Sequence, residues 1–292
     1  MPLRHLMLIF IVILSWGFSF VATKLGLLSV PPLLFGALRF ATLIIPALFF
    51  PLPKIKFSWL IIYGMVMCFG QFTFLFTAIY FGMPAGLASL VMQSQAFFTI
   101  IMGAFILKEF IRPQTLLGLA IAVIGLIIIG YDAGTNATLI GLLLTLCAGL
   151  SWATGNILIK KLQPVNTLHL TIWGGVVSVI PLIACSIIFE GVTTIKDSIL
   201  NINLTTILSV LYLGFIATLL AYGLWAQMLS RYAASIVAPF SLLVPIIGMS
   251  SSAWFLNEHL TTLEIIGSIA VMIGLCVNVF GYRLFFFFKR PQ

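Results

Sequence analysis

The sequence predicts an all-α polytopic membrane protein with ten transmembrane helices, arranged as two inverted five-helix repeats. Three observations predict this fold: an apolar composition, ten apolar runs of membrane-spanning length, and a pattern of residues that occurs twice. Of the 292 residues, 62% are hydrophobic and only 7% are charged, whereas a soluble domain has about 25% charged residues. The mean hydropathy of +1.24 indicates a surface that contacts lipid.

Each apolar run approaches the roughly 20 residues that a helix needs to cross a bilayer. The connections are short, and only residues 190–203 leave room for an additional amphipathic turn. The first run has no small-residue cleavage site after it and is interpreted as a retained helix, not a signal peptide. The ten predicted helices are Leu6–Lys24, Leu33–Phe50, Trp59–Phe81, Ala85–Leu107, Pro113–Tyr131, Leu139–Lys160, Leu168–Phe189, Thr205–Ser230, Ala233–Leu256 and Leu263–Tyr282.

A motif in the first helix, LSWGFSFVATK, returns 136 positions later as LSWATGNILIKK, so that Trp16 corresponds to Trp152 and Lys24 to Lys160. A second motif, KEFIRPQTLLGLAIAVIGL, returns as NEHLTTLEIIGSIAVMIGL at an offset of 149. The two motifs open and close a unit of five helices. Because five is odd, the second unit enters the membrane from the opposite side, as in inverted-repeat transporters. We therefore predict two units, residues 1–134 and 135–292.

The charges orient this bundle. With a cytoplasmic N-terminus, eleven of the fourteen Lys and Arg residues fall on the cytoplasmic side and five of the six acids fall outside, Glu109 being the exception. This asymmetry follows the positive-inside rule and predicts that both termini are cytoplasmic. The eleven residues are Arg4, Lys54, Lys56, Lys108, Arg112, Lys160, Lys161, Arg231, Arg283, Lys289 and Arg290.

Four stretches, WGFSFVATKLGL, FGMPAGLASLVMQSQAFFTI, SWATGNILIKK and VAPFSLLVPIIG, resemble the drug/metabolite transporter superfamily of EamA type, in particular its bacterial exporters of O-acetylserine and cysteine. The Glu-Gly-Gly pattern that closes each repeat is also similar, and the resemblance covers the whole chain. It implies a secondary transporter of the bacterial inner membrane that exports a small amino-acid metabolite by alternating access. Export of other amino acids or small drugs, and uptake, are the alternatives.

Polar side chains at mid-membrane depth are costly and therefore face the bundle interior or a wet cavity. We predict that such residues, together with aromatic walls and two cations near the external mouth, bind the solute. The cations would attract a carboxylate, with snorkelling to the interface as the alternative. The predicted substrate-binding residues are Trp16, Lys24, Arg39, Gln71, Gln93, Gln95, Trp152, Asn156, Tyr222, Trp225 and Ser241.

Alternatives stay open for several of these residues. In a continuous helix Gln93 and Gln95 lie on different faces, so only one of them is expected to line a cavity while the other braces a neighbouring helix. The amides could equally hold helices together, and the aromatic rings could serve ordinary packing. Ser241 lies between Pro239 and Pro245, which are expected to bend their helix beside the site.

Other functional classes lack the residues they need. The sequence has no HExxH motif, no GxxxxGK[ST] loop and no pair of intramembrane carboxylates, which argues against an intramembrane enzyme or an ATP-driven pump. The four cysteines are not in CxxC spacing and are interpreted as packing residues. We predict no metal, no cofactor and no nucleic-acid partner. The partners are a small amino-acid-like solute and the lipid bilayer; the oligomeric state is left open, and a monomer is compatible with the sequence.

Overall fold

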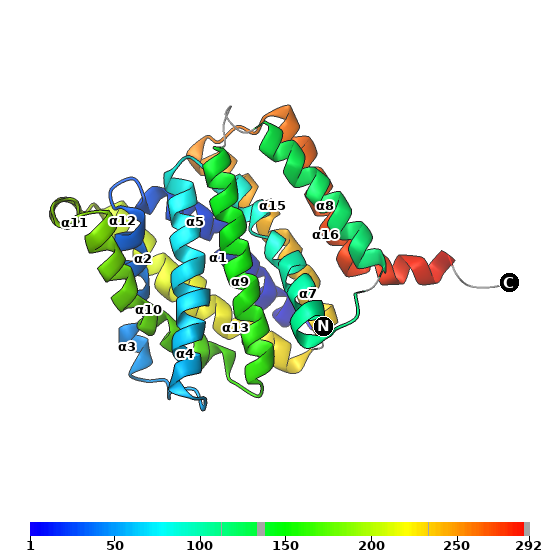
Figure 1. Cartoon of the computed structure of the whole chain (residues 1–292), viewed down its shortest axis with the longest axis horizontal. Coiled ribbons are helices and arrows are strands. Elements are labelled where there is room, and N and C mark those ends of the chain that lie inside the picture. Colours follow the sequence, from blue (N-terminus) through cyan, green and yellow to red (C-terminus); the bar gives the residue numbers. More distant parts are fainter. Residues whose placement is uncertain (112, 133–137, 233, 289–292) are drawn as a thin grey trace.

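The structure is a computed structural model of the chain that describes residues 1–111, 113–132, 138–232 and 234–288. The predicted boundary between the two units, at 134/135, and Ala233 at the start of the predicted ninth helix lie outside these residues. All regular secondary structure in the described part of the chain is helical (Figure 1). The fold class is therefore all-α, as predicted.

Within the described ranges, nine helical stretches are long and apolar enough to cross a membrane, and a tenth, Pro32–Ala47, is shorter. The protein is thus an all-helical polytopic membrane protein. The nine stretches are Leu3–Gly26, Phe57–Tyr80, Ala85–Leu107, Pro113–Tyr131, Leu139–Leu162, Thr167–Phe189, Leu204–Arg231, Pro239–Leu256 and Thr262–Phe280.

The predicted second helix, Leu33–Phe50, is shorter than expected and broken into α2 (Pro32–Ala41) and α3 (Ile44–Ala47). Pro46 has no backbone N–H and cannot donate to the carbonyl of Thr42, four residues earlier. The carbonyl of Thr42 therefore loses its helical partner, and the Thr42 hydroxyl donates a hydrogen bond to the Arg39 carbonyl at 2.6 Å. Helix α2 therefore ends at Ala41, two residues after Arg39.

Two of the long stretches contain a π-helical turn near their centre. Such turns break the regular backbone hydrogen bonding and often lie at functional sites. The first stretch runs through α4 (Phe57–Tyr63), η1 (Gly64–Gly70) and α5 (Gln71–Tyr80). The second runs through α12 (Leu204–Leu211), η2 (Tyr212–Leu220) and α13 (Ala221–Arg231).

The twice-occurring Ser-Trp motif meets these π-helical turns across the bundle. Ser151 in α9 (Leu139–Leu162) donates its hydroxyl to the Val66 carbonyl of η1 at 2.6 Å. Trp16 in α1 (Leu3–Gly26) donates its indole N–H to the Ala217 carbonyl of η2 at 3.0 Å. Each motif thus satisfies a backbone acceptor that belongs to the other part of the chain.

Two further helices are interrupted. The first breaks at Met92–Gln93, between α6 (Ala85–Val91) and α7 (Ser94–Leu107), where the sequence has neither proline nor glycine. The second has a 3₁₀ segment where Pro239 lies, as the proline pattern predicted. It runs through α14 (Ala234–Val237), η3 (Ala238–Leu242) and α15 (Leu243–Leu256).

The helices α8 (Pro113–Tyr131) and α16 (Thr262–Phe288) pack on each other at one edge of the molecule (Figure 1). Glycines permit the close approach: a Cβ built on Gly118 would lie 2.5 Å from the Gly274 carbonyl oxygen, and one on Gly125 2.6 Å from that of Gly267. The contacts run in opposite order along the two helices, so the pair is antiparallel.

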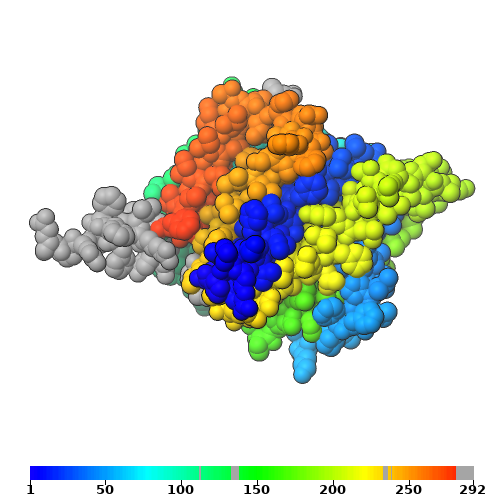
Figure 2. All heavy atoms as spheres, turned by 180° about the vertical axis from the view of Figure 1, so that it is seen from behind, coloured from blue at the N-terminus to red at the C-terminus, as the bar shows by residue number. Residues whose placement is uncertain are grey.

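The remaining elements complete the bundle around α1 and α9. Viewed from behind, α1 lies between α15 on one side and α12 and α13 on the other (Figure 2), while α9 packs against α5 and α7. After α10 (Thr167–Phe189) comes α11 (Val192–Leu200), an amphipathic helix with no buried residue. It occupies the connection where the sequence left room for one.

Candidate functional site

One end of the bundle is closed by two carboxylates that cap helix N-termini. Glu258 accepts hydrogen bonds from the backbone N–H groups of Ala85 at 2.8 Å and Gly86 at 2.9 Å, at the start of α6. The positive end of the helix dipole and the ionised acceptor both strengthen these bonds. We call this end of the bundle the Glu258 end.

Glu190 makes the same arrangement with a second helix. Its carboxylate accepts from the N–H groups of Leu33 at 2.6 Å and Leu34 at 3.0 Å, at the start of α2, and from the Ser186 hydroxyl at 2.6 Å. We refer to Glu190 and Glu258 as the carboxylate caps. Each joins a residue of the later part of the chain to a helix of the earlier part, so together they hold the Glu258 end shut.

The opposite end, which we call the Lys160 end, is held more loosely. Lys160 pairs with Glu109 at 2.9 Å, but these side chains are 43% and 48% exposed. His5 near the start of α1 contacts the Tyr232 hydroxyl through Nδ1 and Arg231 through Nε2. Ion pairs as exposed as Lys160–Glu109 contribute little to stability.

A central cavity of about 410 Å³ opens toward the Lys160 end. Its lining extends from Thr23, near the C-terminus of α1, to the exposed Gln163 in the connection between α9 and α10. The cavity is large enough for a small metabolite, since ligand pockets begin at about 300 Å³. Its described lining residues come from every long helical stretch except α8 and α16, and from the shorter Pro32–Ala47 segment.

The structure brings ten of the eleven sequence-predicted residues together around this one cavity. Lys24 is not among the lining residues; its ammonium lies 3.5 Å from the Ile79 carbonyl oxygen. The ten residues at the cavity are Trp16, Arg39, Gln71, Gln93, Gln95, Trp152, Asn156, Tyr222, Trp225 and Ser241.

Arg39 is the cation of the cavity. The side chain is 5% exposed, and its guanidinium lies 3.8 Å from the centre of the Phe72 ring and 5.3 Å from that of Phe40. One nitrogen donates to the Thr218 hydroxyl at 3.1 Å, but Nε is buried without a partner, as is the amide oxygen of Gln71. Buried polar atoms are costly unless they are hydrogen-bonded. Two residues of the cavity wall therefore carry one unsatisfied donor and one unsatisfied acceptor.

The other amides are engaged with their neighbours. Gln93 donates to the Ser241 carbonyl at 3.2 Å, which joins the two interrupted helices. Asn156 donates to the Gln95 amide oxygen at 3.0 Å and to the Thr99 hydroxyl at 3.2 Å. These contacts hold the amides on the cavity wall. The same residues therefore join neighbouring helices and face a solute in the cavity.

The expectation that only one of Gln93 and Gln95 lines the cavity is wrong. It assumed a continuous helix, in which two residues so spaced point in different directions. The break between α6 and α7 falls at Met92–Gln93 and reorients the following residues. As a result Ser89, Gln93 and Gln95 all line the cavity.

Three aromatic rings form one side of the cavity. The centre of the Trp16 ring lies 5.2 Å from those of Tyr222 and Trp225, with interplanar angles of 62° and 58°. The hydrogen bond from Trp16 to the Ala217 carbonyl fixes its ring. We call these three residues the aromatic cup.

Sequence reasoning missed several lining residues. Ser19 and Thr23 follow Trp16 on one face of α1, and Tyr63 and Thr167 also line the cavity. The three-to-four-residue spacing after Trp16 could have identified the first two. Among the described residues that line the cavity there is no Asp or Glu, and no group of three metal-binding side chains occurs in the part of the chain described.

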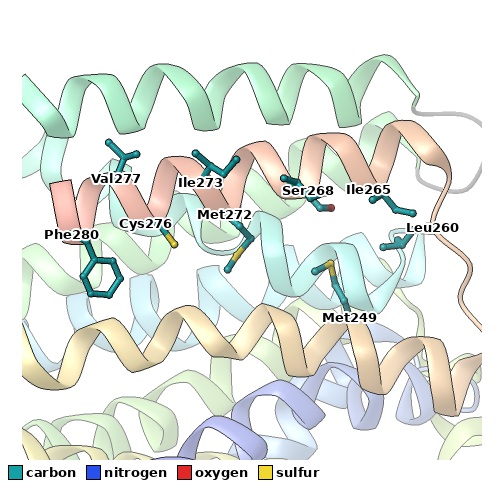
Figure 3. Close-up of a pocket in the computed structure, with 10 residues that line it drawn as sticks. Met249, Leu260, Ile265, Ser268, Met272, Ile273, Cys276, Val277 and Phe280 are labelled. Atoms are coloured by element: carbon teal, nitrogen blue, oxygen red, sulfur yellow. The ribbon is translucent and has the colours of Figure 1, made fainter. Parts of the chain in front are cut away.

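A second cavity, of about 490 Å³, is a groove between α15 and α16 (Figure 3). Figure 3 shows Met272 and Cys276 of α16 and Met249 of α15 turned into it. Apart from Ser268 the lining is aliphatic, aromatic or sulfur-containing, and Ile269 is 54% exposed on the outer surface. The groove lacks convergent polar groups, which distinguishes it from a site for a polar solute.

The sequence matches the EamA-like transporter family over residues 3–131 and 139–280. It is 45% identical to a probable amino-acid metabolite efflux pump of Escherichia coli (strain K12) and 44% identical to one of Salmonella typhimurium (strain LT2), in each case over 94% of both chains. A solved crystal structure shares the fold, with a TM-score of 0.65 and 19% identity over 97% of this chain and 99% of the other.

Proposed function

Because the chain belongs to the EamA-like transporter family, we propose that it exports small amino-acid metabolites, such as O-acetylserine or cysteine, across the bacterial inner membrane by alternating access. The names of its efflux-pump relatives support both the direction and the class of solute. The single observation that carries the proposal is the buried Arg39, whose Nε has no hydrogen-bond partner, in a cavity whose described lining residues include no Asp or Glu.

The solute's carboxylate would complete the surroundings of Arg39. A carboxylate can accept from Nε and from the remaining guanidinium N–H groups in the planar, bidentate geometry that arginine favours. The unpaired oxygen of Gln71 requires a donor, which a hydroxyl, thiol or amine of the same solute can provide. A small amino-acid metabolite carries both kinds of group.

We also propose that the architecture consists of ten transmembrane helices in two inverted repeats, residues 1–134 and 135–292. The contacts of α8 with α16 support it. At the repeat offset of 149, Gly118 corresponds to Gly267 and Gly125 to Gly274, yet the close pairs are Gly118–Gly274 and Gly125–Gly267. This exchange is what a two-fold axis through the helix pair produces. The Pro32–Ala47 segment supplies the tenth, shorter crossing.

The proposed topology places both termini and the Lys160 end in the cytoplasm, with the Glu258 end outside. The cavity then faces the cytoplasm, which is the state that accepts a solute for export. Reporter fusions at Lys54 and Gln292 should report the cytoplasm, whereas one at Asp197 should report the outside. A cytoplasmic signal at Asp197 would contradict the inverted arrangement.

Counterflow in proteoliposomes tests the function. Purified protein should exchange O-acetylserine or cysteine, Arg39→Leu should abolish exchange, and Lys24→Leu should retain most of it. Lys24 is the matched control because it is an intramembrane cation outside the cavity. Size-exclusion chromatography verifies that the variants fold. Equal losses in the two variants would remove the special role of Arg39.

A panel that adds threonine, aromatic amino acids and small drugs separates the alternatives. Exchange of these compounds in preference to O-acetylserine and cysteine would favour an exporter of other amino acids or drugs. Net uptake by intact cells that synthesise none of the solute would favour a permease.

A further inference from the structure

Two members of the aromatic cup, Tyr222 and Trp225, share one helical stretch with the hydroxyl that binds Arg39. Thr218 in η2 accepts the hydrogen bond from Arg39. Tyr222, four residues later, and Trp225, three residues further, follow on the same face, where such neighbours are separated by about 5–6 Å. The cup therefore lies about one helical turn from the guanidinium, on the same cavity.

The cup offers the cavity π-electron surface. Its rings are inclined at 58–62° and are not stacked face to face, so ring surface remains on the cavity that all three residues line. A cation within about 6 Å of such a ring is attracted by its quadrupole, and the attraction grows when the cation is desolvated. An amino acid that enters the cavity carries such a cation in its ammonium group.

The cavity has no other obvious charge partner for an ammonium. Among the described lining residues no carboxylate is present, and Arg39 repels a second cation. The amide oxygen of Gln95 already accepts from Asn156. Apart from the neutral amide oxygen of Gln71, the electron-rich faces of the cup are therefore the groups that can attract an ammonium at short range from Arg39.

We infer that Trp16, Tyr222 and Trp225 form an ammonium subsite, so that the transporter recognises the zwitterionic end of an α-amino acid by Arg39 at the carboxylate and by the aromatic cup at the ammonium. The inference rests on the proposed function, and it leaves the Gln71 oxygen to a side-chain donor such as the thiol of cysteine, which O-acetylserine lacks. It distinguishes amino acids from carboxylates of the same shape that lack the amine.

Competition in the counterflow assay tests the subsite with two probes, O-acetyl-L-serine and its desamino counterpart, 3-acetoxypropanoate. In the unmodified protein, O-acetylserine should compete about tenfold better, a difference of the size that a desolvated cation–π contact provides. In Trp225→Leu this preference should fall to about twofold, mainly through weaker binding of O-acetylserine. Trp225→Phe retains a ring face and should restore most of the preference.

Trp152→Leu is the matched control, because Trp152 lines the same cavity but does not belong to the cup. It should lower the affinity for both probes by a similar factor and leave the preference unchanged. Loss of the preference in Trp152→Leu, or its survival in Trp225→Leu, would overturn the ammonium subsite while transport itself continues. If neither probe competes in the unmodified protein, the proposed solute class fails and the subsite fails with it.

Discussion

The two ends of the helix bundle are closed by different chemistry. At the Glu258 end, two carboxylates accept hydrogen bonds from backbone N–H groups at the starts of α2 and α6 at 2.6–3.0 Å. At the Lys160 end, the counterpart of Glu258 in the sequence repeat, Glu109, instead pairs with a half-exposed lysine. The cavity opens at this second end.

The different contacts indicate how the bundle can be closed at the Glu258 end while it stays open at the Lys160 end. A carboxylate that accepts two N–H bonds at a helix N-terminus is held by directional, charge-assisted contacts. An exposed ion pair tolerates many geometries and is weakened by salt. The helices are thus held together at the Glu258 end, where the carboxylate caps lie, and can separate at the Lys160 end, which has no such caps among the described residues.

The largest expected effect comes from removing one carboxylate cap completely. In a protein without native cysteines, Thr23→Cys places a thiol in the cavity on the side of the Glu258 end. Adding Glu258→Ala deletes two bonds of about 1.5–3 kcal/mol each, since they involve a charged group. We expect the rate of labelling by an impermeant maleimide from the Glu258 end to rise at least about tenfold.

The control for this experiment is Asp197→Asn. Asp197 is an exposed acid at the same end, and the described part of the chain shows no bond from its carboxylate to another helix. This variant should leave the labelling rate unchanged. An unchanged rate in Glu258→Ala would show that the caps do not hold the end shut.

A smaller effect is expected at the second cap. Glu190→Gln removes the charge but keeps an amide oxygen that can still accept from Leu33 or Leu34, and neutral hydrogen bonds are about half as strong. The same labelling assay should show a rise of about threefold. Ser186→Ala, which removes the hydroxyl that supports Glu190, should have a weaker effect in the same direction. A decrease in either variant would contradict the role of this cap.

The smallest effect is expected at the Lys160 end. Lys160→Ala removes an exposed ion pair of the kind that contributes about 0.2–1 kcal/mol. Labelling of a Gln163→Cys thiol from that end should change by less than about threefold, and 0.5 M salt should mimic the substitution. A much larger change would mean that the two ends are more alike than their contacts indicate.

Much of the site could be predicted because burial in a membrane is costly for polar groups. Gln71, Gln93 and Asn156 were identified by depth alone, and all three reach the cavity. The roles of Glu190 and Glu258 could not be predicted, because the sequence places both at helix ends without indicating which N-terminus lies opposite. Lys24 and Arg39 carry the same charge, and the packed bundle distinguishes them: Arg39 contacts Phe72 and Thr218 and lines the cavity, whereas Lys24 does not.

The helix interruptions differ in whether the local sequence predicts them. Pro46 and Pro239 mark two of them, because proline removes a backbone donor. The break at Met92–Gln93 and the π-helical turns have no such marker. They are stabilised by partners distant in the chain, such as Ser151 on the Val66 carbonyl, and such partners are known only after the helices have packed.

The paired bonds to the π-helical turns also have a consequence for biosynthesis. In lipid, a backbone carbonyl without a partner costs several kcal/mol, and the Val66 carbonyl receives the Ser151 hydroxyl only after residues 139–162 have been translated and inserted. The early helices therefore leave the ribosome with an acceptor that a later segment must occupy. Two polypeptides split at the connection between α8 and α9 should be degraded when made singly and recover when made together.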